Sequence, residues 1–195
     1  MQKWLRTARY RLGQVRQQLG FVQHLSTEEY VEVARWLPEE ALSLFKTMSA
    51  ADQRHSLRVC RGLQERSCVE EDMLAAALLH DVGKAGGRVP FWTRPAIVLG
   101  KRLAPGLLRR LVVYPGIAGP PMGTQFNTPK TGEADAKYTV SPAWRRALSN
   151  AWYHAEVGAE LAAAAGLSER AALYIRTHHQ PLGPARELHE VDEVS

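Results

Sequence analysis

Apolar residues recur with helical spacing in several segments of this chain, and polar residues mark where the segments begin. Ser26, followed three residues later by Glu29, predicts a capped helix start. Pro38 interrupts that helix, which restarts over residues 39–48. Ser49 then begins a further helix. The pattern indicates an all-α fold.

The most apolar helix is predicted over residues 73–79, which read Met-Leu-Ala-Ala-Ala-Leu-Leu. Three acids at 70–72 precede it, and acids are favourable at a helix N-terminus. We expect residues 1–50 to form a helical extension and residues 51–195 a helical domain.

The helical pattern breaks between about residues 86 and 142, which we interpret as an insert rich in proline, glycine and basic residues. Pro90 and Pro95 are expected to interrupt the chain there, and Pro105 suits the first position of a short helix. The apolar side of that helix is expected to hold Leu107, Leu108 and Leu111, and its polar side Arg109 and Arg110. Residues 115–132 are a candidate mobile loop or lid.

Composition agrees with a globular protein of 195 residues. No run of 18 or more apolar residues is present, and the basic N-terminus lacks the apolar stretch of a signal peptide. Cys60 and Cys68 have no metal-binding spacing and are expected to be buried thiols rather than a disulfide. We therefore expect a cytoplasmic protein.

The net charge of +5 is unevenly distributed. Residues 82–153 hold eleven Lys or Arg against two acids, whereas residues 154–195 hold three against seven. Basic side chains of the insert, among them Arg94, Arg109 and Arg110, either lie in water above an apolar face or attract a polyanionic substrate. Nucleic acid or anionic lipid would satisfy the same charge, but no nucleic-acid-binding motif is present.

The first segment is also basic, with no acid before Glu28. Its basic residues are Lys3, Arg6, Arg9, Arg11 and Arg16. They could form a helix for a membrane surface or nucleic acid, or the solvated face of a helix that packs on the domain.

His80 and Asp81 stand together at the end of the apolar helix. Burying an unpaired carboxylate costs roughly several kcal/mol, because the group loses its water shell and nothing replaces it. Either an ion pair of Asp81 with a Lys or Arg, or a bound divalent cation, would remove this cost. The sequence around the pair alone leaves both open.

The other candidate ligands lie on, or at the ends of, segments with helical spacing, where they could converge on one interior point. They are His55, His154, His178, His179 and Asp192. Imidazole and carboxylate ligands without cysteine suit Mn, Fe, Co, Ni or Zn. We therefore expect one or two divalent transition-metal ions as the cofactor.

The order His55, His80-Asp81 and a distant Asp192, with Gly83 and Lys84 completing a His-Asp-x-Gly-Lys motif, resembles the HD superfamily of metal-dependent phosphohydrolases. The resemblance covers about residues 51–195 outside the insert. His154 and His178 align with the extra histidines of the dinuclear branch. The stretch from His154 to His178 is similar to bacterial HD hydrolases that cut diadenosine tetraphosphate symmetrically.

The resemblance implies an HD-domain helical bundle in which metal-activated water cleaves a phosphoanhydride or phosphoester bond, in a nucleotide or dinucleoside polyphosphate. The implied ligands of the first ion are His55, His80, Asp81 and Asp192, and Asp81 would bridge to a second ion held by His154 and His178. The Gly-Tyr-Pro motif of the cyclic-dinucleotide branch is missing. The alternative function is a catalytically inactive HD regulator that binds a nucleotide, metal or partner.

Several roles stay open at this stage. Lys84 either contacts a substrate phosphate or is a surface lysine at a helix C-terminus. His179 is a spare ligand, a general acid or an exposed histidine. Asp192 is only three residues from the end of the sequence, and Glu187, Glu190 or His189 could replace it.

Overall fold

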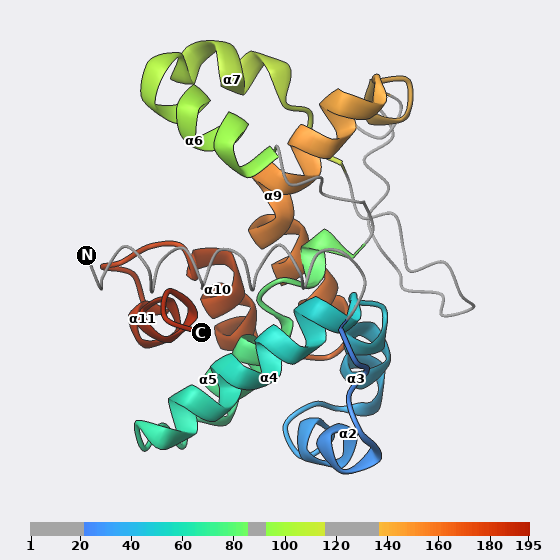
Figure 1. Ribbon diagram of the computed structural model, residues 1–195, viewed down its shortest axis with the longest axis vertical. Coiled ribbons are helices and arrows are strands. Elements are labelled where there is room, and N and C mark those ends of the chain that lie inside the picture. Colours follow the sequence, from blue (N-terminus) through green and yellow to red (C-terminus); the bar gives the residue numbers. More distant parts are fainter. Residues whose placement is uncertain (1–21, 86–92, 116–136) are drawn as a thin grey trace.

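A computed structural model describes residues 22–85, 93–115 and 137–195, with some side chains of α6 and α7 left out. Every regular element in these ranges is a helix, which confirms the predicted all-α fold. Figure 1 shows a main body of helices from which one long helix, α9, rises to a separate helical hairpin. No helix of the described ranges is both long and apolar enough to cross a bilayer.

The first half of the main body follows the predicted order of helices. Its elements are α2 (Thr27–Val33), α3 (Glu39–Lys46), α4 (Ala50–Glu65), α5 (Glu71–Leu79) and the short 3-10 helix η1 (Val82–Lys84). Ser26 forms the predicted capping box with Glu29, and Ser49 caps α4 by accepting from the Asp52 amide. Local polar signals therefore set these helix starts.

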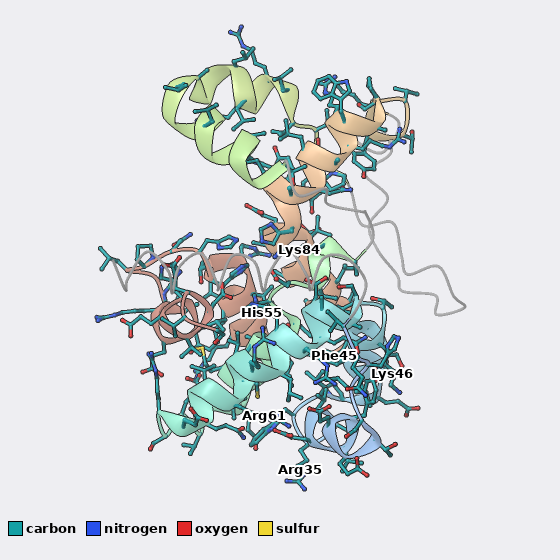
Figure 2. The ribbon with its side chains drawn as sticks, in the orientation of Figure 1. Arg35, Phe45, Lys46, His55, Arg61 and Lys84 are labelled. Atoms are coloured by element: carbon teal, nitrogen blue, oxygen red, sulfur yellow. The ribbon has the colours of Figure 1, made fainter. Side chains whose placement is uncertain are left out.

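The second half consists of α9 (Ala143–Ala164), α10 (Glu169–Thr177) and α11 (Arg186–Asp192). These helices share one apolar core with α2 to α5. Phe45 of α3, labelled in Figure 2, and Leu74 of α5 are fully buried in it. Residues of the expected extension thus pack in the same core as the expected domain.

Two tight contacts position helices that carry candidate ligands. A Cβ on Gly62 of α4 would lie 2.7 Å from Val191 of α11, so these two helices approach closely where the chain has no side chain. Arg61 donates two hydrogen bonds to Glu32, at 2.9 and 2.5 Å, and so ties α4 to α2 (Figure 2).

The described part of the insert is a hairpin of α6 (Thr93–Leu103) and α7 (Pro105–Leu111), which packs on the first half of α9. Pro105 begins α7 as predicted. The expected interruption at Pro95 is wrong, because Pro95 lies in the first turn of α6. Backbone N–H groups of the first turn have no acceptor within the helix, so a proline there removes no helical hydrogen bond. Leu107 is also not on the apolar side: it is exposed, whereas Leu108 is buried. The predicted loop at 115–132 lies almost wholly outside the described residues.

Candidate metal centre

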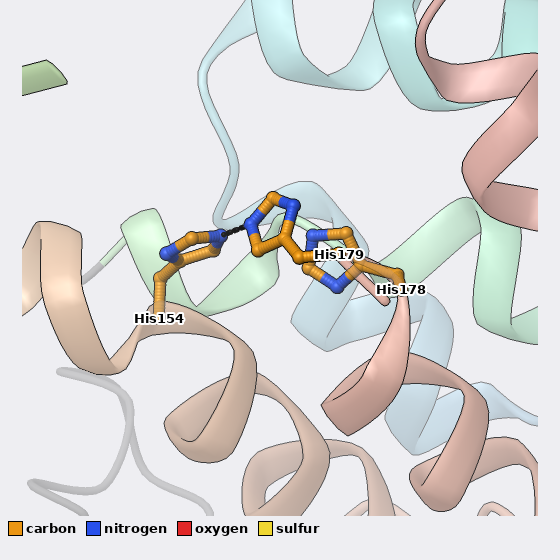
Figure 3. Close-up of side chains that lie close together, drawn as sticks. All are labelled: His154, His178 and His179. Atoms are coloured by element: carbon orange, nitrogen blue, oxygen red, sulfur yellow. Dashed lines mark hydrogen bonds between the residues drawn. The ribbon is translucent and has the colours of Figure 1, made fainter. Parts of the chain in front are cut away.

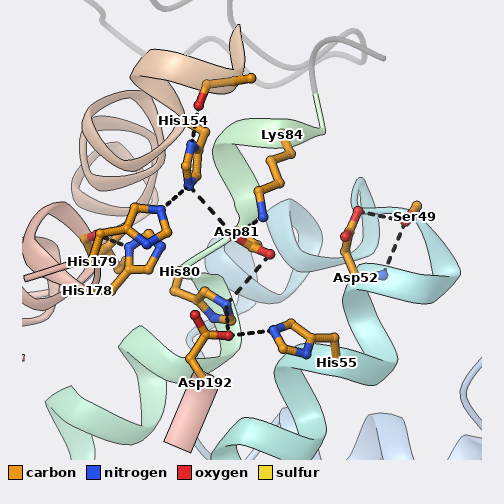
Figure 4. A network of polar contacts seen from close by, with 12 residues as sticks. Ser49, Asp52, His55, His80, Asp81, Lys84, His154, His178, His179 and Asp192 are labelled. Atoms are coloured by element: carbon orange, nitrogen blue, oxygen red, sulfur yellow. Dashed lines mark hydrogen bonds and ion pairs between the residues drawn. The ribbon is translucent and has the colours of Figure 1, made fainter. Parts of the chain in front are cut away.

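The predicted ligands converge in the main body from five helices and the turn after α5 (Figure 4). His55 belongs to α4, His154 to α9, and Asp192 is the last residue of α11. His80 and His178 are each the residue that directly follows a helix, α5 and α10. The ends of α5, α10 and α11 and the interiors of α4 and α9 therefore surround a common interior point.

The first group of side chains joins His55, His80 and Asp81, whose ligand atoms all lie within 4.8 Å of one another. Asp192 completes this group. Its Oδ1 is 2.8 Å from His55 Nε2 and 3.6 Å from His80 Nε2. The first group is thus two imidazoles and two carboxylates, a set that can hold a divalent transition metal.

The second group consists of His154, His178 and His179 (Figure 3). The Nε2 atoms of His154 and His179 are 2.9 Å apart. Asp81 Oδ1 is 3.9 Å from His154 Nε2, while its Oδ2 is 3.6 Å from His80 Nε2. One carboxylate therefore lies between the two groups and presents an oxygen to each.

Three of the imidazoles are oriented by their own helices. His80, His154 and His178 each donate Nδ1–H to the backbone carbonyl three residues earlier, at 2.8, 2.9 and 2.6 Å. This contact aims Nε2 into the centre and leaves it as the atom for a metal. The Nε2 atoms of His80 and His178 are buried without a hydrogen-bond partner. Buried polar atoms are rarely left so, and a cation would satisfy both.

In the first group, the carboxylates favour positive charge on their neighbours. Burial would lower the pKa of His80, but Asp81 and Asp192 outweigh burial and raise it. Burial would raise the pKa of Asp192, yet the hydrogen bond with His55 and the nearby ring of His80 hold it well below its usual value. The carboxylates are therefore ionised, as metal ligands must be.

The second group is electrostatically different. Burial lowers the pKa of both His154 and His178 to about 3, with a further contribution from nearby positive charge. Partial burial of its ring also lowers the pKa of His179. The three rings are thus neutral, which is the protonation state that binds a metal.

Lys84 lies inside the centre rather than on the surface. Its ammonium is 2.5 Å from Asp81 Oδ1, and both side chains are largely buried (Figure 4). Burial would raise the pKa of Asp81, but Lys84 and the surrounding histidines hold it well below its usual value. The ion pair considered for Asp81 is therefore present, although it leaves the Nε2 atoms of His80 and His178 unsatisfied.

The packing of η1 on α9 explains why the motif has glycine at position 83. A Cβ at this position would lie 1.9 Å from the carbonyl oxygen of His154 and 2.9 Å from the nitrogen of Gly158. No side chain fits there, so η1 rests directly on the backbone of α9. This contact sets the position of His154 relative to Asp81.

The structure also separates the alternatives near the end of the sequence. Glu190 pairs with Arg66 and Arg186, and Glu187 is exposed. His189 donates through Nδ1 to the carbonyl of His178, at 3.0 Å. Asp192 is the acid of α11 that enters the centre, and His189 braces the backbone that carries His178.

Two basic residues of the insert that were predicted to contact substrate, Arg109 and Arg110, are not brought to the centre, whereas Lys84 is. Arg109 and Arg110 are exposed on α7, in the hairpin at the far end of α9 from α10 (Figure 1). The side chain of Arg94 lies outside the described residues. The contact of His179 with His154 and the bracing role of His189 were not predicted, and the only signal for them was the clustering of histidines near the end of the sequence.

No protein-family model, curated protein or solved structure matches this chain. The likeness to HD phosphohydrolases therefore stays a resemblance of motif residues. The geometry of the centre carries the functional argument.

Proposed function

We propose that this chain is a metal-dependent phosphohydrolase with one or two divalent transition-metal ions at the candidate metal centre. The proposal rests on two Nε2 atoms, that of His80 in the first group and that of His178 in the second. Both are buried without a hydrogen-bond partner. Such atoms are costly in a folded protein unless they have a ligand. The neutral imidazoles of His154 and His178 and the ionised carboxylates of Asp81 and Asp192 complete a suitable donor set.

The residues of the chain divide the work in this proposal. His55, His80, Asp81 and Asp192 would hold the first ion, and His154 and His178, with His179 beside them, the second. A bound divalent ion supplies Lewis acidity and lowers the pKa of water from 15.7 toward about 7. Phosphoryl transfer then requires mainly alignment and charge neutralisation from the protein.

Lys84 supplies a positive charge within this site. Its ammonium is held by Asp81, and a phosphate oxygen offers it a second acceptor, because an ammonium has three donors. His179, which is the most exposed residue of the second group, would carry a proton to or from a leaving oxygen. We propose a nucleotide or dinucleoside polyphosphate as the substrate, on the likeness of the stretch from His154 to His178.

The test begins with elemental analysis of protein purified without chelator. We expect one to two equivalents of a transition metal. Hydrolysis of a nucleotide panel, including dinucleoside polyphosphates, is then measured with added Mn or Fe. His80→Ala and Asp81→Ala should abolish turnover, because each removes a ligand. His24→Ala is the matched control, since His24 is exposed outside the centre.

A second candidate is a catalytically inactive HD-like regulator that binds a nucleotide or partner. The ion pair between Lys84 and Asp81 favours it, because a buried carboxylate paired with an ammonium needs no metal. Absence of metal together with tight nucleotide binding and no turnover would select this function. Metal with turnover of phosphate esters other than nucleotides would retain the hydrolase and overturn the substrate.

A further inference from the structure

The hairpin of α6 and α7 carries a surface that the candidate metal centre does not use. Leu108 and Val112 join Leu148 of α9 in a small core separate from the main one. Three other leucines remain outside it: Leu99, Leu103 and Leu107 are 58%, 71% and 59% exposed. Exposed apolar side chains that gather in a patch mark surfaces that bind another protein or a membrane.

The same segment is entirely basic in its charged residues. Residues 93–115 contain no Asp or Glu, and their five basic residues are Arg94, Lys101, Arg102, Arg109 and Arg110. Arg109 and Arg110 are exposed on α7. Positive charge and exposed apolar side chains therefore occur together on one short hairpin.

The beginning of α9 extends this surface. Arg145 donates to the carbonyl oxygens of Leu111 and Arg110, at 2.6 and 3.2 Å, so the start of α9 lies against the end of α7. The preceding Trp144 is 48% exposed, and Val140, four residues earlier in the chain, is 83% exposed. Tryptophan is favoured where apolar and polar phases meet.

We propose that this hairpin surface, formed by α6, α7 and the start of α9, docks on an anionic lipid bilayer. Exposed leucines and a tryptophan enter the boundary between headgroups and acyl chains, while Arg109 and Arg110 contact anionic headgroups. A second copy of the chain is a poor occupant, because it would bring two sets of five positive charges together. Nucleic acid would match the charge but would leave the leucines without apolar contacts.

Docking of this kind would hold the candidate metal centre near the bilayer. Trp152 and Tyr153 pack against the hairpin core and directly precede His154. Ten residues of α9 separate Trp144 from His154, which corresponds to about 15 Å along the helix. The inference rests on the hairpin alone, so its failure would leave the proposed hydrolase untouched.

The test is co-sedimentation of the full chain with vesicles of phosphatidylcholine alone and of phosphatidylcholine mixed with phosphatidylserine. We expect binding only to the mixed vesicles, weakening as salt is raised. Arg109→Glu should lower the affinity at least about tenfold, since reversing one charge changes two charge units near the surface. Leu103→Gln combined with Leu107→Gln should lower it severalfold through loss of apolar contact.

Matched controls carry the same changes elsewhere. Arg35→Glu alters an exposed arginine at the opposite end of the molecule from the hairpin (Figure 2), and Leu182→Gln alters a leucine that is 92% exposed between α10 and α11. Both should bind as the unaltered chain does. Circular dichroism establishes that each variant is folded. Equal binding to both vesicle types, unchanged binding of the folded hairpin variants, or equal losses in the controls would overturn the proposal.

Discussion

Lys84 and Asp81 determine the charge balance of the candidate metal centre. The ammonium lies 2.5 Å from this carboxylate, which presents an oxygen to each group of histidines, and both side chains are largely buried. A cation bound at Asp81 would therefore compete with Lys84 for the same oxygen. The lysine neutralises the centre when no metal is bound.

Replacement of this lysine should make the protein more dependent on metal. We expect Lys84→Met to destabilise the metal-free protein by about 3–5 kcal/mol, because it leaves a buried carboxylate unpaired. Added Mn or Zn should then raise the melting temperature of the variant more than that of the unaltered protein. Calorimetric titration should show tighter metal binding.

The control for this prediction is Lys46→Met, which alters an exposed lysine of α3 (Figure 2). It should change neither the melting temperature nor the metal response. Equal metal-induced shifts in Lys84→Met and the unaltered protein would show that the ammonium does not compete with the ion.

The buried histidines also predict how stability depends on pH. His154 and His178 have pKa values of about 3 in the folded protein, against about 6.5 in an unfolded chain. Between these values the unfolded state binds more protons, so their contribution to stability falls as the pH is lowered through this range. His80 acts in the opposite direction, because its pKa is raised.

Comparison of variants isolates this effect. In chelator-treated protein, the loss of unfolding free energy between pH 7 and pH 5 should be smaller in His178→Leu than in the unaltered chain, as followed by denaturant unfolding. His24→Leu should keep the original pH dependence. A pH profile of His178→Leu parallel to that of the unaltered protein would contradict burial of a neutral ring.

At the scale of elements, the contact of η1 with α9 joins the two groups of ligands. Sequence patterns predicted the helix starts at Ser26, Ser49 and Pro105, because capping and proline preferences act within a few residues. They could not predict that Gly83 touches the backbone of His154, because that approach depends on how η1 packs on α9. The same limit explains Leu107, whose exposure is decided by what α7 packs against.

Gly83→Ala should separate these two elements. Its Cβ would overlap the His154 carbonyl, and overpacking of this kind costs about 1–3 kcal/mol. We expect a lower melting temperature and, because His154 moves from Asp81, fewer metal equivalents by elemental analysis. Gly106→Ala is the matched control: nothing lies within 4 Å of its new Cβ, so neither quantity should fall. Full metal content in a folded Gly83→Ala protein would show that the contact does not position the ligands.

At the scale of the whole molecule, α9 connects two apolar cores of unequal size. Its second half belongs to the main core, and its first half supports the hairpin through the small core around Leu108. The sequence identified the predicted ligands that converge, because their residue types and motif spacing are distinctive. It did not reveal that the hairpin lies away from those ligands, since that separation depends on the direction of the 22-residue helix α9.

The small core should open without disturbing the main one. Leu108→Ala is expected to speed amide hydrogen exchange over residues 93–113, because a buried leucine is lost from a cluster with few other members. Exchange in α5 and α10, and metal content, should not change. The neighbouring Leu107→Ala alters an exposed side chain and should leave exchange as it was. Faster exchange throughout the protein would show that the two cores unfold together.

The bonds from Nδ1 of three histidines to carbonyls of their own helices have a practical consequence for protein engineering. Each ring has its tautomer and direction set by a bond within four consecutive residues. Such a helical turn is a self-contained unit that can be grafted. A designer who joins three such units at the apex of a bundle would obtain inward-facing nitrogen donors before optimising any other part of the scaffold.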